Sequence, residues 1–432
     1  MYALIDGNNF FVACEIALRP SLAGLPVIVT GNNDGCAIAR SNEAKALGVK
    51  MGDPWFKIRH LADSHGLVAL SANFALYGDL SDRMMSLAAG LGHKQECYSI
   101  DESFLDMSNI PGNLVERSHK VRSRILQWVG IPCCVGLGTT KTLAKLANHV
   151  AKSAERKPGS YPVQLAQVCD LSALTPPELE SVMAATAINE VWGIGRQLTK
   201  QLNESGITNV LELVRLDPAM IRARWSVILE RTVRELQGTS CIEFEDVPSP
   251  KQEIACTRSF GQPITELRDL NEAITEFASR GAVKLRKQGS QAGQVMVFIR
   301  TSPFRKDPQY SRSITVPLRR PSADTAAIVG AALSGLKSIY KPGYKYAKAG
   351  VMLLDLQSDT VQQTELDFQD DDAPDRGRLM ASLDELNNRY GRGTVLMASA
   401  GLAREKRAWS MKQERRTPAY TTSWADIPIA RA

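Results

Sequence analysis

The chain has 432 residues and a formal net charge of +6, from 52 Lys and Arg against 46 Asp and Glu. This length, with 44% hydrophobic residues, predicts several packed domains and excludes a fibrous or largely disordered protein. The sequence has no apolar run long enough for a membrane span and no secretory signal pattern, so we expect a cytoplasmic protein without a membrane partner. Eight scattered cysteines, without CxxC pairs, indicate reduced thiols and not a zinc site.

The positive charge is spread unevenly along the chain. Residues 253–350 contain 16 Lys and Arg against 7 Asp and Glu, whereas residues 355–375 contain 8 acidic residues and no basic ones. Such a basic segment favours a domain that faces a polyanion, and the acidic segment after it favours a linker or tail. Charge alone does not separate nucleic-acid binding from an ordinary lysine-rich surface.

The first third of the chain alternates strand-like and helix-like segments. Short apolar runs predict strands over residues 2–6, 26–30, 95–100, 103–108 and 132–137. Helical periodicity predicts helices over residues 10–19, 41–47, 73–89 and 114–129. The closely spaced third and fourth strands predict a hairpin, and the mixture favours an α+β sheet over a doubly wound one.

The remainder divides into a helical part and a second mixed part. Residues 191–238 are typical of short-looped helices, and residues 244–252, which are rich in Pro and acidic side chains, indicate a linker. The basic segment then predicts a second α+β domain from a helix, a strand and a helix over residues 270–287, 295–301 and 325–340.

Three acidic residues lie where apolar strands end. Asp6 closes the first strand, where an Asp is more often a turn or cap residue than a catalytic one. Asp101 and Glu102 are neighbours in the predicted hairpin, and adjacent carboxylates repel each other unless a cation lies between them. Carboxylates on neighbouring strands suit Mg²⁺, which binds a few of them together with substrate phosphates. The pattern therefore favours a phosphate-transfer site.

A basic stripe follows the last of these strands. On a helical wheel, Lys141, Lys145, Asn148 and Lys152 fall within about 60° of each other. Such a stripe can bind a triphosphate, although a solvated amphipathic face gives the same pattern. The spacing of the glycines in Gly136-Leu-Gly138 does not match a GxxxxGKT phosphate loop.

Two glycines separate helical stretches at Trp192-Gly-Ile-Gly195, directly before Arg196. A loop of this kind can bring backbone N–H groups and a helix N-terminus against a phosphodiester without reading bases. An ordinary tight helix turn is the alternative, and the nearby Arg196 and Lys200 favour contact with a DNA backbone.

Six motifs in a fixed order carry a family resemblance. They are Ala3-Leu-Ile-Asp6, Asn33-Asp-Gly-Cys36, Glu43 to Trp55, Tyr98-Ser-Ile-Asp-Glu102, Lys141 to Asn148 and Trp192-Gly-Ile-Gly195. With these motifs the chain resembles the Y-family translesion DNA polymerases, and most closely the UmuC-type catalytic subunit of bacterial DNA polymerase V. The resemblance extends from Met1 to about Tyr420.

The resemblance implies an α+β right-hand polymerase. Its parts would be a ferredoxin-like palm (residues 1–10 and 73–165), small fingers (11–72), a thumb with a helix-hairpin-helix (166–240), an α+β little finger (250–355) and a C-terminal tail (356–432). It also implies error-prone translesion synthesis in the SOS response, on primer-template DNA with dNTP substrates. The implied location is the bacterial cytoplasm, at the nucleoid when the enzyme is active.

The resemblance further implies residue roles. The catalytic acids, which with the Gly7 carbonyl would bind two Mg²⁺ ions, are Asp6, Asp101 and Glu102. Phe11 matches the steric gate, an aromatic side chain that lies under the sugar and clashes with a 2′-hydroxyl. The residues matching dNTP contacts are Phe10, Asn42, Lys45 and Lys152, of which Lys45 replaces a common arginine and Asn42 a common tyrosine. Those matching DNA contacts are Gly193, Gly195, Arg196, Arg258 and Ser259.

Protein partners are implied as well. Gln363, Leu366 and Phe368 resemble a peptide of bacterial polymerases that docks into a sliding-clamp groove. The residues after 375 resemble the UmuC-type extension, which in that family engages a dimer of cleaved UmuD and the RecA filament.

Two other functions compete with this interpretation. A nucleotide cyclase can use a similar palm with acids on a hairpin, but it needs neither the glycine hairpin nor the basic domain. A non-catalytic DNA-binding or scaffolding subunit is the second alternative, and the presence of all three acids disfavours it.

Overall fold

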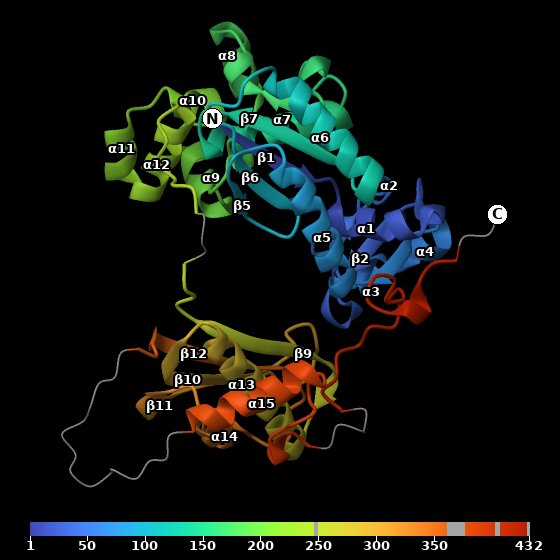
Figure 1. Ribbon diagram of the computed structural model, residues 1–432, viewed down its shortest axis with the longest axis vertical. Coiled ribbons are helices and arrows are strands. Elements are labelled where there is room, and N and C mark those ends of the chain that lie inside the picture. The colour runs from blue at the N-terminus through green and yellow to red at the C-terminus, as the bar shows by residue number, and fades with distance from the viewer. Residues whose placement is uncertain (246–248, 361–375, 402–406, 430–432) are drawn as a thin grey trace. The chain divides into compact units, whose positions relative to one another are not determined.

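The computed structural model describes residues 1–245, 249–360, 376–401 and 407–429 (Figure 1). The chain forms two compact units. The first consists of Met1–Gly31, Gly35–Pro248 and Arg415–Ala432, and the second of Asn32–Asp34 and Ser249–Glu414. Within the described ranges, no helix is both long and apolar enough to cross a membrane. All eight cysteines are free, as expected.

The first unit is built on a five-stranded sheet with the order β5-β6-β1-β7-β8. These strands are β1 (Tyr2–Gly7), β5 (Gln95–Cys97), β6 (Glu102–Asp106), β7 (Cys133–Gly138) and β8 (Val168–Asp170). The central strand β1 pairs antiparallel with both β6 and β7, and β8 lies parallel to β7. The predicted hairpin is confirmed, because β5 and β6 pair antiparallel on either side of residues 98–101.

Alternation along β1 sends its side chains to two different layers. Ala3 and Ile5 are fully buried in a core with helices α1, α5 and α6, whereas Leu4 packs with Ala144 of α7 on the opposite face. Because successive residues of a strand point to opposite faces, Asp6 lies on the same face as Leu4, toward α7. These helices are α1 (Phe10–Leu18), α5 (Phe74–Ala89), α6 (Leu114–Val129) and α7 (Lys141–Arg156).

Helix α7 lies unusually close to β7 because two glycines allow it. A Cβ atom at Gly136 would lie 2.2 Å from the Ala144 carbonyl oxygen and 2.2 Å from the Asn148 amide nitrogen. A Cβ atom at Gly138 would lie 2.6 Å from the Ala144 amide nitrogen. The glycines in this strand therefore serve backbone packing, in agreement with the absence of a phosphate-loop spacing.

A smaller sheet follows in the same unit, with the order β3-β2-β4 and a parallel pair between β2 and β4. Its strands are β2 (Val27–Thr30), β3 (Ala37–Arg40) and β4 (Val68–Ser71), and its helices are α2 (Asn42–Ala46), α3 (Trp55–Ile58) and α4 (His60–His65). Strands β3 and β4 were not predicted. The remaining helices of the unit are α8 (Pro176–Ala185), α9 (Arg196–Glu204), α10 (Val210–Val214), α11 (Pro218–Arg224) and α12 (Val227–Leu236).

The second unit is a four-stranded antiparallel sheet with the order β11-β10-β12-β9. Its strands are β9 (Ile254–Ile264), β10 (Ser290–Thr301), β11 (Ser311–Ser322) and β12 (Tyr346–Ser358). Helices α13 (Leu267–Lys287) and α14 (Thr325–Ile339) share one buried core with this sheet (Figure 1). Arg286 of α13 holds helix α15 (Gly377–Arg389) through two hydrogen bonds of 2.8 and 2.7 Å to Asp384.

Short 3₁₀ helices complete the chain. They are Pro20–Leu22, Asn32–Asp34, Val163–Leu165, Leu171–Ala173, Ile188–Glu190, Ala398–Ala400 and Trp424–Asp426. The prediction of an α+β fold with two mixed parts and a helical part between them is confirmed. The division into palm, fingers, thumb, little finger and tail is finer than the two units and stays a prediction.

Candidate active site

The three predicted acids meet at one end of the five-stranded sheet. Register pairs Asp6 with Glu102 directly across β1 and β6. The next amide, of Gly7, donates a hydrogen bond of 2.8 Å to the Asp101 carbonyl oxygen. Residues opposite each other in an antiparallel pair present their side chains on the same face, so Asp6 and Glu102 lie side by side.

Two lysines of α7 reach these carboxylates. Lys152 forms an ion pair with Asp6, and the Lys145 ammonium lies 2.7 Å from a carboxylate oxygen of Glu102. Lys141 is only 1% exposed and pairs instead with Glu96, away from the acids. The predicted basic stripe is therefore divided: two of its lysines pair with the acidic cluster, and the third is buried in an ion pair with Glu96.

Burial and crowding change the acidity of the pair. Burial raises the pKa of Asp6 to about 7, the Lys152 ammonium opposes this rise, and the neighbouring Glu102 adds to it. Burial would also raise the pKa of Glu102, but hydrogen bonds with Asp6 and Lys145 hold that pKa below its usual range. The two carboxylates thus form a site that favours additional positive charge.

The donor set fits a hard divalent cation. Asp6, Asp101 and Glu102 offer carboxylate oxygens, the ligands that Mg²⁺ prefers in proteins. In the protein without ligands, the lysines neutralise Asp6 and Glu102, and the Ser99 hydroxyl donates a hydrogen bond of 2.6 Å to Asp101. Across the described ranges, no three acidic, histidine or cysteine side chains already converge on one metal position.

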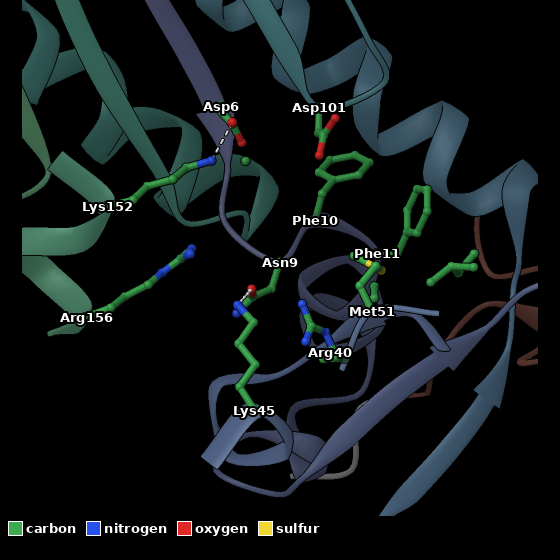
Figure 2. A pocket seen from close by; sticks show the side chains of 13 residues that line it. Asp6, Asn9, Phe10, Phe11, Arg40, Lys45, Met51, Asp101, Lys152 and Arg156 are labelled. Atoms are coloured by element: carbon green, nitrogen blue, oxygen red, sulfur yellow. Dashed lines mark hydrogen bonds and ion pairs between the residues drawn. The ribbon is translucent and has the colours of Figure 1, made fainter. Parts of the chain in front are cut away.

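A cavity of about 250 Å³ opens beside the acids (Figure 2). Asp6, Gly7 and Asp101 form one part of its lining, and four basic side chains form another: Arg40, Lys45, Lys152 and Arg156. Glu102 is not part of this lining. Acidic and basic side chains that line one cavity suit a ligand that carries both a metal-bound and a lysine-bound phosphate.

The basic side chains come from three different elements of the first unit. Lys152 and Arg156 lie one turn apart on α7, whereas Arg40 ends β3 and Lys45 lies on α2. Arg40 and Arg156 were missed from the sequence. For Arg156 a signal was available, because it lies four residues after Lys152 on the same helix face.

Asn9 organises the α2 side of the cavity. Its backbone is left-handed, with φ of 50°, a conformation that asparagine tolerates better than most residues. Its amide nitrogen donates to the Asn42 side chain at 3.0 Å, and its amide oxygen accepts from Lys45. Asn42 itself does not line the cavity. Burial, helped by Arg156, Arg40 and Lys152, lowers the pKa of Lys45 to about 8.

Two phenylalanines, Phe10 and Phe11, line the same cavity, and two further aromatic side chains pack against Phe11. Phe11 stacks on Tyr77, with ring centroids 4.6 Å apart and an interplanar angle of 17°. Phe74 contacts Phe11 edge to face at 5.9 Å. Phe10 also lines the cavity but is 3% exposed, so it belongs mainly to the core. Phe11 is the aromatic side chain that is both half-exposed and supported from behind.

None of the predicted DNA contacts lines this cavity. Gly195 and Arg196 line a separate shallow hollow at the start of α9, and Gly193 lies in the turn just before it. Arg258 and Ser259 belong to β9 in the second unit, where the half-buried Arg258 guanidinium lies 5.8 Å from the Trp409 ring centroid. The clamp-binding residues, Gln363, Leu366 and Phe368, lie outside the described residues.

Three regions of the chain match known protein families. Residues 5–149 match the impB/mucB/samB family and residues 251–366 match the C-terminal domain of the same family. Residues 377–430 match a domain described as of unknown function, DUF4113.

Curated relatives cover the whole chain. Protein ImpB of Salmonella typhimurium is 42% identical over 434 residues, covering 100% of both chains. Protein UmuC of Salmonella typhimurium strain LT2 is 40% identical over 432 residues, covering 99% of both. Protein MucB of Escherichia coli is 39% identical over 435 residues, covering 100% of this chain and 99% of that protein.

Solved structures share the fold. A Y-family DNA polymerase chimera of Dbh and Dpo4 matches with a TM-score of 0.64 at 20% sequence identity, covering 83% of this chain and 99% of the chimera. An insertion ternary complex of Dbh DNA polymerase matches with a TM-score of 0.52, also at 20% identity, with the same coverage. The predicted right-hand polymerase fold is confirmed. Together with the full-length relatives, these matches show that the chain belongs to the impB/mucB/samB family, the UmuC-type Y-family DNA polymerases.

Proposed function

We propose that this chain copies damaged DNA as the catalytic subunit of a polymerase V type complex in the bacterial SOS response. Its family makes it an error-prone translesion DNA polymerase that binds DNA and dNTPs and depends on divalent metal ions. In the proposed reaction the primer 3′-hydroxyl attacks the α-phosphate of a dNTP and pyrophosphate leaves. The observation that carries the proposal is the meeting of Asp6, Asp101 and Glu102 beside a cavity with four basic side chains.

The acids are proposed to act as metal ligands. Asp6, Asp101, Glu102 and the carbonyl of Gly7 would hold two Mg²⁺ ions. When bound, such ions lower the pKa of an attacking hydroxyl and neutralise the charge that develops on the leaving group. The raised pKa of Asp6 supports this role, because a carboxyl group that resists ionisation in the free protein gains most from a nearby cation.

The basic side chains are proposed to bind the triphosphate. Lys152 pairs with Asp6 and also lines the cavity, so its ammonium can serve either the carboxylate or a phosphate oxygen. Lys45, Arg40 and Arg156 provide further positive charge from the other sides. Asn42 would act indirectly by holding Asn9, which in turn holds Lys45. Preorganised charges of this kind stabilise the developing negative charge without moving during the reaction.

Phe11 is proposed to exclude ribonucleotides. It lines the cavity near Asp101, and Tyr77 supports it from behind. A rigid ring under the sugar would clash with a 2′-hydroxyl, while a deoxyribose would fit. Phe10, which is almost fully buried, would form part of the same cavity lining.

DNA is proposed to contact both units. Gly193, Gly195 and Arg196 precede or begin α9, where free N–H groups and the helix dipole favour a phosphodiester. Arg258 and Ser259 would contact the DNA backbone from β9, and the net charge of +9 over residues 253–350 supports a polyanion there.

The tail is proposed to recruit protein partners. Gln363, Leu366 and Phe368 would bind the sliding clamp, and the residues after 375 would engage a cleaved UmuD-type dimer and the RecA filament. The similarity of this chain to ImpB and UmuC over its full length supports these assignments. Such a complex would work in the cytoplasm, on DNA of the nucleoid.

Primer extension on a template with an abasic site tests this function. We expect the wild-type chain, with Mg²⁺, cleaved UmuD-type dimer and activated RecA filament, to extend a primer past the lesion. A sliding clamp should lengthen the products, because it keeps the polymerase on the DNA. Replacing both Leu366 and Phe368 with Ala should weaken clamp affinity by at least about tenfold, since such anchors carry most of the energy of a small interface.

Surface plasmon resonance on immobilised clamp measures that affinity, and gel analysis measures the products. Leu25 and Leu126, which are exposed in the first unit, provide a matched control pair for replacement by Ala. An unchanged clamp affinity in the Leu366 and Phe368 variant would exclude the peptide. Failure to pass the lesion under every condition would exclude translesion synthesis.

The lowered pKa of Lys45 predicts a pH dependence of dNTP binding. The ammonium form binds phosphate, and it is lost as pH rises through the pKa of about 8. Above this pH, kcat/KM for the dNTP should therefore fall, by up to about tenfold per pH unit. Lys45→Arg should flatten this fall, because a guanidinium stays charged across the range.

Single-nucleotide incorporation between pH 7.5 and 9.5 measures the profile. The range lies above the pKa of Asp6, so that carboxylate contributes little to the slope. Lys57→Arg is the matched control, because Lys57 is exposed on α3 and does not line the cavity. If Lys45→Arg and wild type lose activity in parallel, Lys45 is not the titrating group.

A further inference from the structure

A short part of the C-terminal segment is anchored inside the first unit. The Arg415 carbonyl oxygen accepts a hydrogen bond of 3.0 Å from the Ser71 amide, and the Arg415 amide donates to the Ser71 hydroxyl at 2.9 Å. Arg416 forms a parallel bridge with Ser71, so the segment pairs with the last residue of β4. The Arg415 guanidinium lies 4.8 Å from the ring centroid of Trp55. More than 340 residues separate these partners in sequence.

Asn73 fastens the next two residues of the segment. It occupies the N-cap position of α5, where an asparagine side chain usually accepts from the N–H groups of its own helix. Here the side chain makes no such bond and is fully buried. Its amide nitrogen donates to the Thr417 carbonyl at 3.3 Å, to the Thr417 hydroxyl at 3.1 Å and to the Pro418 carbonyl at 3.1 Å.

The Thr417 hydroxyl reaches a fully buried carboxyl group. It donates a hydrogen bond of 3.3 Å to Oε1 of Glu15, and the Tyr77 hydroxyl donates to the same oxygen at 2.7 Å. Burial raises the pKa of Glu15, and the two hydroxyl donors and Arg19 oppose that rise. Among the described residues, Oε2 of Glu15 has no hydrogen-bond partner. Each remaining donor to this carboxyl group therefore matters, since unsatisfied buried polar groups are costly.

Tyr77 connects this buried group to the cavity. One end of its side chain is held by Glu15, and its ring stacks on Phe11, which lines the cavity. Tyr77 is fully buried, so its ring moves only if its neighbours move. A continuous set of contacts thus leads from Thr417 through Glu15 and Tyr77 to Phe11.

We propose that Thr417 is a positioning residue that sets sugar selectivity through Glu15 and Tyr77. The inference rests on the proposed role of Phe11 as the steric gate. With both hydroxyl donors in place, Glu15 has one orientation, the Tyr77 ring has one position, and Phe11 has a fixed support. When the Thr417 donor is removed, the carboxyl group loses one of its restraints, and the support of Phe11 loosens. The C-terminal segment is then part of the substrate-selecting apparatus.

Two substitutions at Thr417 separate the hydroxyl group from the shape of the side chain. Thr417→Val keeps the shape and removes the donor, whereas Thr417→Ser keeps the donor. We expect Thr417→Val to lower the ratio of kcat/KM for dCTP to that for CTP by about fivefold, the typical effect of one hydrogen bond. Thr417→Ser should keep the wild-type ratio. The change should lie mainly in the ribonucleotide KM, with kcat for dCTP within about twofold of wild type.

A double-mutant cycle with Phe11→Ala tests whether the effect acts through the gate. In the Phe11→Ala background, Thr417→Val should not change the ratio further. An equal change in both backgrounds would overturn the proposal, as would an unchanged ratio in the single Thr417→Val variant. If Phe11→Ala alone leaves the ratio unchanged, the gate assignment itself is wrong, and this result is distinguishable from failure of the Thr417 role.

Thermal melting shows whether each variant is folded. Should Thr417→Val unfold, Tyr77→Phe decides the question, because it keeps the stacked ring and removes the other donor to Glu15. It is expected to lower the same ratio by about fivefold. An unchanged ratio in folded Tyr77→Phe would overturn the proposal.

Discussion

Asp101→Asn is expected to reduce primer extension by about 1,000-fold, while binding of primer-template duplex stays within about twofold of wild type. The substitution is nearly isosteric and removes one negative charge from the acidic side of the cavity. The backbone bond between Gly7 and Asp101 does not depend on this side chain, so the end of the sheet should keep its geometry. The loss should therefore fall on chemistry and metal binding, and not on folding.

Rapid-quench primer extension measures the rate, and fluorescence anisotropy measures duplex binding. A third readout is Mn²⁺ binding by electron paramagnetic resonance, which should weaken in Asp101→Asn. Asp106→Asn is the matched control, because Asp106 lies at the other end of β6 and accepts a hydrogen bond from the Ser108 amide at 2.9 Å. Extension at the wild-type rate in Asp101→Asn would contradict the assignment of the acids as metal ligands.

Phe11→Ala is expected to raise ribonucleotide incorporation relative to deoxyribonucleotide incorporation by about 100-fold. The ring lies on the floor of the cavity, and Tyr77 prevents it from moving away from a bulkier sugar. Removing the ring leaves room for a 2′-hydroxyl without adding any attraction for it. The gain should therefore appear as a lower KM for the ribonucleotide.

Single-nucleotide incorporation with matched dNTP and rNTP pairs measures this ratio. Phe56→Ala is the control, because Phe56 is a phenylalanine of the same unit that is exposed on α3 and does not line the cavity. It should keep the wild-type ratio. If Phe11→Ala also keeps it, another residue selects the sugar.

The sequence was sufficient to predict that the acids lie on neighbouring strands. A short apolar run over residues 2–6 and the close spacing of the two strands around Asp101 and Glu102 predicted a strand that ends at Asp6 and a hairpin at the acid pair, and register brings Asp6 and Glu102 together. Short patterns of this kind determine local geometry, because side chains alternate between the two faces of a strand and a hairpin places its two strands side by side.

The basic side of the cavity was harder to predict. Arg40 ends a strand of four residues, Ala-Ile-Ala-Arg, that is too short to give a clear periodic signal. In the second unit, β9 and β11 were also not predicted, because β9 contains Gly261 and Pro263, and β11 contains Pro317 and no fully buried residue.

Contacts between residues far apart in the sequence could not be predicted, for a different reason. The bonds from Asn73 and Glu15 to Thr417 join residues more than 340 positions apart, and no local pattern in either segment encodes the other. Asn73 even carries the signal of an ordinary helix cap. The structure shows that its side chain has been diverted to a tertiary contact.

The close packing of α7 on β7 limits which parts of the cavity tolerate substitution. Any side chain at Gly136 or Gly138 would collide with the helix backbone, so the position of Lys152 relative to the acids cannot drift by small steps. Helix α2 is short and is free of that constraint, and it carries Asn42 and Lys45. Substitutions that reshape the cavity are therefore easier to accommodate on the α2 side than on the α7 side, where two glycines fix the distance between helix and strand.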